Sequence, residues 1–378
     1  MRITLVTTEF LGVGHTGGVG VGARLLGRSL AGRGHDVAVV VAARRDRAGQ
    51  RTRIDGIDVM THWRADLMAL TRLVRDSDPD VVHCIQASAG AWLAEKAVPD
   101  GAFVVEPVDP RAMRDWAIEF AHPTRSRLRM LPSFFYFATP PARLAVRRAD
   151  AIQVPAEFLQ QKVQQMYRLS RPPLLARIPV EPPPRIEKST TPLVVFVGRL
   201  DRRKRPDMFV DLARSFPGVR FVAMGSGADP AHTERLHERA APLDNLSFTG
   251  FLDQLADSRF HDLLGSAWIL VNTSAREGLP VSFIEAASHG CAILSACDPD
   301  GYASRFGQAV AGGDYAGGLD RLLSDDRWRE LGAEGAAHVA RHHDPQATTD
   351  HQCAIYADAL AQVARRRGSA AAVRPGGS

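Results

Sequence analysis

Two runs of short apolar segments, separated by a proline-rich stretch, constrain the fold of this chain more than any other feature of its sequence. Within each run the apolar segments alternate with segments of helical period, which is the pattern of parallel strands joined by crossover helices. Because the apolar segments are continuous, both faces of each sheet should be covered by helices. The pattern predicts an α/β protein built from two doubly wound, Rossmann-like domains.

The proline-rich stretch at residues 178–184 suits neither a helix nor a strand, so we interpret it as the linker between the domains. The first domain should span residues 1–180 and the second 181–344. A terminal helix, 345–367, should follow and pack back against the first domain, and the small residues 368–378 should be disordered. The expected strands are 3–7, 37–42, 81–84, 103–105 and 151–154 in the first domain and 193–198, 220–225, 246–250, 268–272 and 292–295 in the second.

Ligands of doubly wound sheets bind beyond the carboxyl ends of the strands, so we expect the active site in a cleft between the domains. Glu277 lies on the loop after the strand 268–272, and a helix is expected from Pro280 to His289. The N-terminus of that helix carries unpaired N–H groups and a partial positive charge, which suit a diphosphate. Glu285 lies roughly 7.5 Å further along the axis, so the two carboxylates can bracket a nucleotide sugar. The competing interpretation is a loop carboxylate and a solvated helix residue.

A basic segment follows the first strand of the second domain. Arg199 stands at the carboxyl end of that strand, where its guanidinium can bind two phosphate oxygens, and Lys204 adds a second positive charge. Fixed cations of this kind stabilise the charge that grows on a departing diphosphate, so we expect no metal and no other cofactor. The alternative is a solvated basic loop, which is our interpretation of Arg202, Arg203 and Arg205.

A glycine-rich loop follows the first predicted strand, and Gly12, Gly14 and Gly17 match the spacing of a dinucleotide fingerprint. A nicotinamide-dependent oxidoreductase is therefore the second functional hypothesis. The match is weak because residues 9–11 separate the loop from the strand and the helix begins beyond the motif. We favour a loop whose backbone at Gly17 and Gly18 approaches a phosphate or sugar closely, and a loop without a ligand is the third interpretation.

Taken in order, these motifs resemble the retaining glycosyltransferases of family 4, which have the GT-B fold. The resemblance also covers residues 33–36, 79–83 and 149–151 and so spans nearly the whole chain. It implies that Glu277 contacts the donor sugar, that Glu285 contacts the ribose, and that Arg199 and Lys204 bind the diphosphate. The donor-binding residues that it implies are Gly17, Gly18, Gly225, Gly227, Gly278, Leu279 and Glu285.

The resemblance predicts a transferase that moves a sugar, with retention of configuration, from a UDP- or GDP-sugar to a small-molecule or lipid-linked acceptor. Many members carry a histidine after the strand equivalent to 103–105, but Glu106 and Asp109 stand in that region here. This departure leaves a third functional hypothesis, a GT-B protein that binds a nucleotide sugar without turnover. The candidates for the acceptor side are His15, His83, Glu106 and Asp109.

The segment 125–137 is the candidate rim of the acceptor site, because it places Arg125, Arg127 and Arg129 before a run of aromatic residues. It suits an amphipathic acceptor or an anionic lipid surface, with Pro132 expected to break the helix; the alternative is that the aromatic residues are core. The sequence lacks a signal peptide and a membrane-spanning run, so we expect a cytoplasmic protein with peripheral contact at the inner face of the membrane.

The remaining features exclude other classes of function. The formal charge of +5 comes with no aromatic-interleaved basic strand or recognition helix, so we expect no nucleic-acid partner. The cysteines are scattered, with no metal-ligand spacing. The sequence from Asp298 to Asp300 is typical of a turn rather than a metal site.

Overall fold

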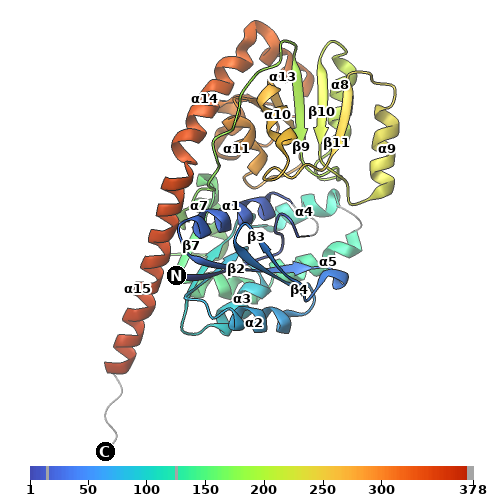
Figure 1. Ribbon diagram of the computed structural model, residues 1–378. Coiled ribbons are helices and arrows are strands. Elements are labelled where there is room, and N and C mark those ends of the chain that lie inside the picture. Colours follow the sequence, from blue (N-terminus) through green and yellow to red (C-terminus); the bar gives the residue numbers. More distant parts are fainter. Residues whose placement is uncertain (14–16, 124–126, 373–378) are drawn as a thin grey trace, which may run out of the picture. The chain divides into compact units, whose positions relative to one another are not determined.

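The computed structural model describes residues 1–13, 17–123 and 127–372, and the contacts within the chain divide it into two compact units. Unit 1 comprises Met1–Pro110, Ser133–Pro179 and Pro345–Ser378, and unit 2 comprises Arg111–Pro132 and Val180–Asp344. Each unit is a sheet flanked by helices, as Figure 1 shows. The predicted α/β class with two doubly wound domains is confirmed.

Unit 1 contains an eight-stranded sheet within the described residues, in the order β3-β4-β2-β1-β5-β6-β7-β8. Neighbouring strands are parallel except β3 and β4, and the continuous apolar sequence of β1 and β5 is buried as expected for a covered parallel sheet. The strands are β1 Arg2–Thr7, β2 Asp36–Ala43, β3 Arg51–Ile54, β4 Ile57–Trp63, β5 Val81–Ile85, β6 Ala102–Glu106, β7 Ala151–Val154 and β8 Leu174–Leu175. The helices are α1 Gly18–Gly32, α2 Leu67–Asp76, α3 Ala89–Ala97, α6 Pro140–Arg148, α7 Glu157–Tyr167 and α15 Pro345–Ala372, with a 3-10 turn at Arg45–Arg47.

Unit 2 contains a six-stranded parallel sheet within its described part, in the order β11-β10-β9-β12-β13-β14. Its strands are β9 Leu193–Val197, β10 Arg220–Met224, β11 Leu246–Gly250, β12 Ile269–Asn272, β13 Ala292–Ser295 and β14 Gly307–Ala309. Its helices are α4 Met113–Ala121, α8 Pro206–Ser215, α9 Pro230–Ala240, α10 Ser258–Ser266, α11 Val281–Ser288, α12 Tyr302–Arg305, α13 Tyr315–Leu323 and α14 Arg327–His342, with 3-10 turns at Pro299–Gly301 and Ser324–Asp326. Helix α5, Arg127–Phe137, contains the boundary between the two units at Pro132.

All ten predicted strands are present to within one residue at each end, but the hairpin β3–β4 and the short strands β8 and β14 were not predicted. Its two strands are antiparallel and joined by Asp55 and Gly56, which both have positive φ, 51° and 80°. Asp-Gly flanked by Ile54 and Ile57 is a hairpin signal, so the sequence did contain the information. The buried Arg24 of α1 also pairs with Asp55, at 2.8 Å from Nε to Oδ2, and fixes the turn against the helix.

The terminal helix α15 packs on β6, β7 and α1 of unit 1. Its buried side chains Ile355, Tyr356, Ala359 and Val363 belong to the same apolar cluster as Ile3 and Leu5 of β1. The helix continues to Ala372, so it extends into the segment 368–378 that was expected to be disordered.

Two expectations for the segment after β6 are wrong. Pro132 does not break the helix, because α5 runs from Arg127 to Phe137 through it. A proline inside a helix removes one N–H donor and crowds the carbonyl four residues earlier, which can kink a helix without ending it. Residues Arg111–Pro132 also belong by their contacts to unit 2 rather than to the first unit. The buried side chain of Glu119 on α4, for example, contacts Arg203 and Arg276 of unit 2.

Candidate active site

The central strand β9 of unit 2 lies between β10 and β12, so the order of the strands reverses at β9. The loops after β9 and β12 therefore leave the same edge of the sheet side by side. Ligands of doubly wound sheets bind at such a switch point. This topology brings together the segments 198–205 and 273–280, which carry the residues predicted to bind and cleave the donor.

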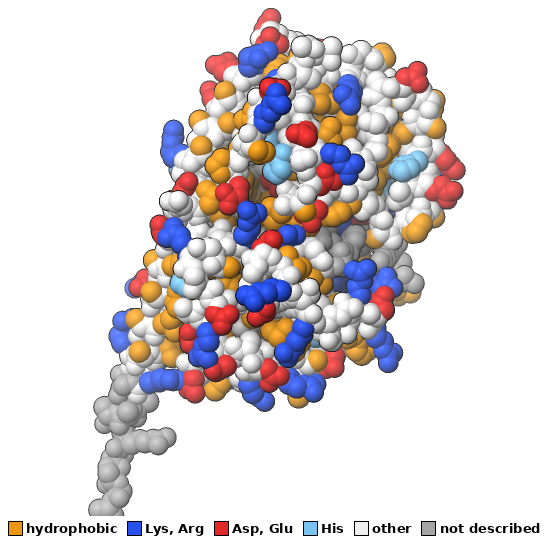
Figure 2. Space-filling view, viewed as in Figure 1, with side chains coloured by type: hydrophobic (Ala, Val, Ile, Leu, Met, Phe, Trp, Pro, Cys, Tyr) orange, Lys and Arg blue, Asp and Glu red, His pale blue; other side chains and the backbone are white. Residues whose placement is uncertain are grey.

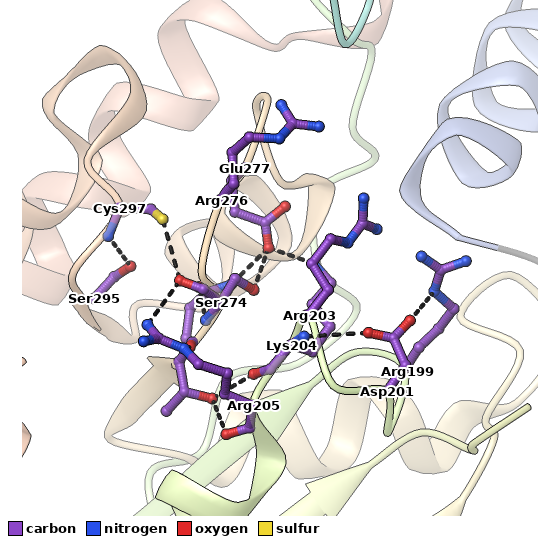
Figure 3. Close-up of polar contacts among 12 residues, drawn as sticks. Arg199, Asp201, Arg203, Lys204, Arg205, Ser274, Arg276, Glu277, Ser295 and Cys297 are labelled. Carbon is purple, nitrogen blue, oxygen red and sulfur yellow. Dashed lines mark hydrogen bonds and ion pairs between the residues drawn. The ribbon is translucent and has the colours of Figure 1, made fainter. Parts of the chain in front are cut away.

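Glu277 and Lys204 face each other from these two loops and form an ion pair (Figure 3). The same carboxylate oxygen of Glu277 accepts hydrogen bonds from Asn272 Nδ2, at 3.2 Å, and from the hydroxyl of Ser274. Burial raises the pKa of Glu277, but the charges of Lys204 and Arg203 and the hydrogen bonds from Lys204 and Ser274 outweigh it and lower the pKa overall. Glu277 is therefore an ionised carboxylate at neutral pH.

The loop after β9 is held by the buried carboxylate of Asp201. Arg199 Nε lies 3.2 Å from Asp201 Oδ2, and the backbone N–H of Lys204 donates to Oδ1 at 3.1 Å. Asp201 thus orients both of the cationic residues that were predicted to bind the diphosphate.

Arg205 ties the loop after β9 to the loop after β12. Its Nε donates to the carbonyl of Thr273 at 2.6 Å and its Nη2 donates to that of Ser274 at 3.1 Å. The hydroxyl of Thr273 donates in return to the carbonyl of Lys204 at 2.6 Å. The expectation that Arg205 is a solvated loop residue is therefore wrong, and so is that for Arg203, whose Nη1 bonds the buried Glu119 at 3.0 Å.

A polar cluster surrounds the two loops, and several of its cationic side chains are partly buried. Phosphate oxygens are strong hydrogen-bond acceptors for guanidinium and ammonium groups, so a diphosphate suits these loops. The cationic members are Arg199, Arg203, Lys204, Arg205 and Arg276, and the anionic members are Glu119, Asp201 and Glu277.

Glu285 lies on the buried face of α11 rather than in solvent. Gln254 Nε2 donates to its Oε1 at 2.7 Å, and burial raises the pKa of Glu285 to about 7. His289 also lies behind the helix, where its Nδ1 approaches the carbonyl of Glu285 at 2.7 Å and its Nε2 lies 3.1 Å from Nδ1 of His261. Burial lowers the pKa of His289 to about 4, so its ring is neutral at neutral pH. These contacts hold both the side chain and the backbone carbonyl of Glu285 in place.

Two of the predicted donor-side glycines, Gly225 and Gly227, occupy close-packed positions. A Cβ on Gly225 would lie 1.8 Å from the carbonyl oxygen of Gly198, so only glycine fits where β9 and β10 end. Gly278 and Leu279 are half-buried on the loop between Glu277 and α11. A surface hollow of about 600 Å³ includes Gly227 but none of the predicted cationic residues in its lining, which consists of Gly227, Pro230, Thr233, Glu234, His237 and Glu238.

Among the predicted residues of unit 1, Gly17 and Gly18 lie at the start of α1. Gly17 is the N-cap of α1, and its N–H donates to the carboxylate of Glu9 at 2.8 Å, so a side chain already supplies an anion at this helix N-terminus. Gly18 begins α1. His15 lies outside the described residues, as do Arg125 and the side chain of Arg129.

His83 and Glu106 lie inside unit 1, and their contacts favour a structural role over an acceptor site. His83 Nε2 is 3.1 Å from Glu106 Oε2, and His83 Nδ1 is 2.8 Å from the hydroxyl of Tyr356 on α15. Gln153 of β7 donates to the same oxygen of Glu106 at 2.9 Å. Asp109 is half-buried on the loop after β6.

Among the residues that the structure describes, no group of three or more His, Cys, Asp or Glu side chains is arranged to hold a metal ion. Asp298 accepts the backbone N–H groups of Ala303 and Ser304 at 2.8 and 3.1 Å, which is the turn expected there. No helix in the described ranges has the length and apolar content that crossing a membrane requires. On the face drawn in Figure 2 acidic and basic side chains are interspersed rather than separated by sign.

Comparison with known families matches both halves of the chain. Residues 16–183 match the family described as Glycosyltransferase Family 4, and residues 180–324 match the family described as Glycosyl transferases group 1. A D-inositol 3-phosphate glycosyltransferase of Acidothermus cellulolyticus is 26% identical over 94% of this chain and 88% of its own length.

Two solved structures share the fold at low sequence identity. Sucrose-phosphate synthase from Thermosynechococcus elongatus superposes with a TM-score of 0.72 and 17% identity, covering 95% of this chain and 99% of that one. Anabaena HepE, solved in complex with UDP and glucose, superposes with a TM-score of 0.68 and 13% identity, covering 93% of this chain and 98% of that one.

Proposed function

Because the chain is a glycosyltransferase of family 4 with the GT-B fold, we propose that it binds the diphosphate of a nucleotide sugar at the loops after β9 and β12. The observation that carries this proposal is the placement of Arg199 and Lys204 together on the loop at the switch point of the unit 2 sheet. A diphosphate there accepts hydrogen bonds from both side chains. Arg199 and Lys204 are partly buried, which strengthens their interaction with an anion relative to the same pair in water.

In the proposed reaction the acceptor hydroxyl attacks the anomeric carbon from the face that the diphosphate leaves. The bond between the anomeric carbon and the diphosphate oxygen breaks, that oxygen keeps the electron pair, and it takes the proton of the acceptor hydroxyl. The configuration of the sugar is therefore retained. Arg199 and Lys204 stabilise the charge that develops on the departing diphosphate, so the step needs neither a protein nucleophile nor a metal ion.

The two glutamates take different roles in this proposal. The carboxylate of Glu277 is ionised and sits beside the cation that binds the leaving group, so it can accept hydrogen bonds from hydroxyls of the donor sugar. Glu285 is held by Gln254, on the turn before α10, and accepts the ribose hydroxyls. Glu277 then contacts the part of the donor that reacts, and Glu285 contacts the part that anchors it.

The donor is a UDP- or GDP-sugar in this proposal. UDP is supported by HepE, which has the same fold and whose structure holds UDP and glucose. The acceptor is a small molecule or a lipid-linked molecule. A polar, phosphorylated acceptor is supported by the name of the Acidothermus cellulolyticus relative, which specifies D-inositol 3-phosphate.

Helix α5 provides the surface for an amphipathic acceptor or for peripheral contact with a membrane. Leu128, Leu131 and Phe135 are 78%, 40% and 62% exposed. Their spacing of three and four residues places them on one face of the helix. Arg127 at the start of the helix is exposed and adds a positive charge.

The deciding experiment measures thermal stabilisation by a panel of ligands, followed by turnover of the ligands that bind. UDP, GDP, ADP, their sugars and NADH are compared at about 100 times their dissociation constants, where binding adds about 2.7 kcal/mol to the free energy of unfolding. Stabilisation by one nucleoside diphosphate, with release of that diphosphate from its sugar, supports the proposal. Stabilisation by NADH alone would support an oxidoreductase, and binding without release would support a non-catalytic GT-B protein.

A further inference from the structure

Glu119 on α4 is a buried carboxylate surrounded by arginine side chains, and neither the motifs nor the family likeness assigns it a role. Arg276 donates to its Oε1 from Nη2 at 2.9 Å and from Nε at 3.3 Å. Arg203 Nη1 donates to the same oxygen at 3.0 Å, and Arg111 Nε lies 3.8 Å from it. The side chain of Glu119 is only 5% exposed. A buried carboxylate with these contacts orients the guanidiniums around it.

The positions of its partners connect Glu119 with the proposed diphosphate site. Arg203 directly precedes Lys204, and Arg276 directly precedes Glu277. One carboxylate therefore bonds the residue next to each member of the Lys204–Glu277 ion pair. A shift of Glu119 would move both loops at the residues that contact the donor in the proposed function.

Local structure on α4 fixes the direction of the Glu119 side chain. Asp115 Oδ2 accepts the backbone N–H of Ala112 at 2.9 Å and closes the start of the helix. Trp116, one turn before Glu119, is 2% exposed, and the guanidinium of Arg111 lies 5.1 Å from the centre of its ring. Glu119 and Trp116 are spaced by three residues, so they share one face of the helix. The carboxylate is thus held on an anchored element.

We propose that Glu119 is a positioning residue for sugar transfer, which acts through Arg203 and Arg276 on Lys204 and Glu277. The inference rests on the proposed function. The Glu119 carboxylate also offsets part of the positive charge that attracts the diphosphate. Its removal therefore has two separable effects: the loops lose the contact that orients them, and the local positive charge increases.

These two effects predict a split between turnover and affinity. In Glu119→Gln, the loss of orientation should lower kcat by on the order of tenfold or more, because small displacements of reacting groups cost large factors in rate. The added positive charge should leave the affinity for the nucleoside diphosphate equal or tighter. A residue with a merely structural role would weaken both quantities or neither.

The experiment first identifies the nucleotide sugar that the wild-type protein turns over fastest. The kcat and KM for that donor, and the Kd of its nucleoside diphosphate by calorimetry, are then measured for wild type and Glu119→Gln. A lower kcat with an equal or lower Kd supports the proposal. Wild-type kcat in the variant, or a parallel loss of kcat and affinity, would overturn it. Absence of both binding and turnover in the wild type would instead reject the proposed function.

Two further variants cover the case in which Glu119→Gln does not fold. Glu119→Asp keeps the charge but withdraws the carboxylate by one methylene, so kcat should fall while Kd stays unchanged; wild-type kcat would overturn the proposal. Asp211→Asn is the matched control, because Asp211 also contacts two arginines, Arg214 at 2.8 Å and Arg239 at 2.7 Å, but on the exposed face of α8. Its kinetic constants should equal those of the wild type.

A double-mutant cycle tests whether Glu119 acts through Arg276. If it does, Arg276→Gln combined with Glu119→Gln should lower kcat no further than the more damaging single substitution, since contacting residues are not additive. Multiplication of the two single effects on kcat would show that Glu119 does not act through Arg276, and would overturn that part of the proposal.

Discussion

The ammonium group of Lys204 and the carboxylate of Glu277 form an ion pair that joins the loops after β9 and β12. Lys204 stands 73 positions before Glu277 in the chain, yet the parallel pairing of β9 with β12 brings their loops together. In the proposed function this pair separates the tasks of the site. Lys204 binds the departing diphosphate, and Glu277 binds the sugar that is transferred.

Substitution of either diphosphate-binding cation should cripple transfer while the protein stays folded. Arg199→Ala and Lys204→Ala each remove one fixed positive charge, and the loss of one such electrostatic contact typically lowers kcat about a hundredfold or more. Turnover of the donor and thermal melting would be measured for both variants. Near-normal turnover in both would mean that the diphosphate binds elsewhere.

The two glutamates should differ in their effect on turnover. Glu277→Gln should lower kcat more than Glu285→Gln, because Glu277 is proposed to contact the reacting sugar and Glu285 only the ribose. Glu285→Gln should mainly raise KM. Steady-state kinetics with the same donor decide the order, and a larger loss of kcat in Glu285→Gln would reverse the two roles.

Donor affinity should fall as the pH falls through 7. Burial raises the pKa of Glu285 to about 7, and the ionised form is the better acceptor for ribose hydroxyls. Calorimetry with the nucleoside diphosphate at pH 6 and pH 8 should show weaker binding at pH 6. The phosphate groups of the ligand also titrate in this range, so Glu285→Gln is the control. If the variant showed the same pH dependence as the wild type, Glu285 would not be the titrating group.

The same shift has a consequence for stability. The pKa of Glu285 is about 7 in the folded protein and near its ordinary value of 4.5 when unfolded, so the folded state binds the extra proton between these two pH values. This contribution to the free energy of unfolding is complete below pH 4.5 and is lost as the pH rises through 7. Glu285→Gln should therefore gain thermal stability relative to wild type at pH 8 and not at pH 4.

Sugar transfer should survive chelation of divalent metals. The proposed mechanism uses Arg199 and Lys204 for the charge that a metal ion would otherwise stabilise. Turnover would be measured after dialysis against EDTA, with and without added magnesium. A loss of activity that magnesium restores would contradict the metal-free mechanism.

The exposed face of α5 should be needed for contact with an amphipathic acceptor or a membrane. Replacing Leu128 and Phe135 by Ser removes the most exposed apolar side chains of that face. Binding to vesicles of anionic phospholipid, measured by sedimentation, or transfer to a lipid-linked acceptor should weaken. Donor hydrolysis should stay unchanged. Met68→Ser is the control, because Met68 is 72% exposed on α2. If both variants bound vesicles and used the lipid-linked acceptor as well as the wild type does, the exposed face of α5 would not have this role.

The sequence predicted those parts of the fold and site that depend on neighbouring residues. Continuous apolar runs predicted β9 and β12, and the residues that follow each run, Arg199 and Glu277, were predicted at the ends of these strands. The hairpin at Asp55 and Gly56 was missed although its turn signal is present. The spacing between Glu277 and Glu285 predicted that Glu285 contacts the donor. The sequence of the helix alone did not predict that the Glu285 side chain is buried.

Contacts between distant segments could not be predicted. Glu119 lies 84 positions from Arg203 and 157 from Arg276, and nothing in the periodicity around Glu119 distinguishes it from an ordinary surface glutamate. The same holds for His83 and Tyr356, which lie 273 positions apart. Local pattern predicts which elements form, whereas pairing between buried polar groups depends on how the elements pack.

The return of α15 to unit 1 determines when that unit can complete its fold during synthesis. Tyr356, which is the partner of His83 in the middle of the unit, leaves the ribosome only after the continuous segment of unit 2 has been made. Unit 2 can therefore fold around β9 while β5 and β6 still lack the helix that covers them. Strands β5 and β6 are thus synthesised before the continuous segment of unit 2 but acquire their full set of contacts after it.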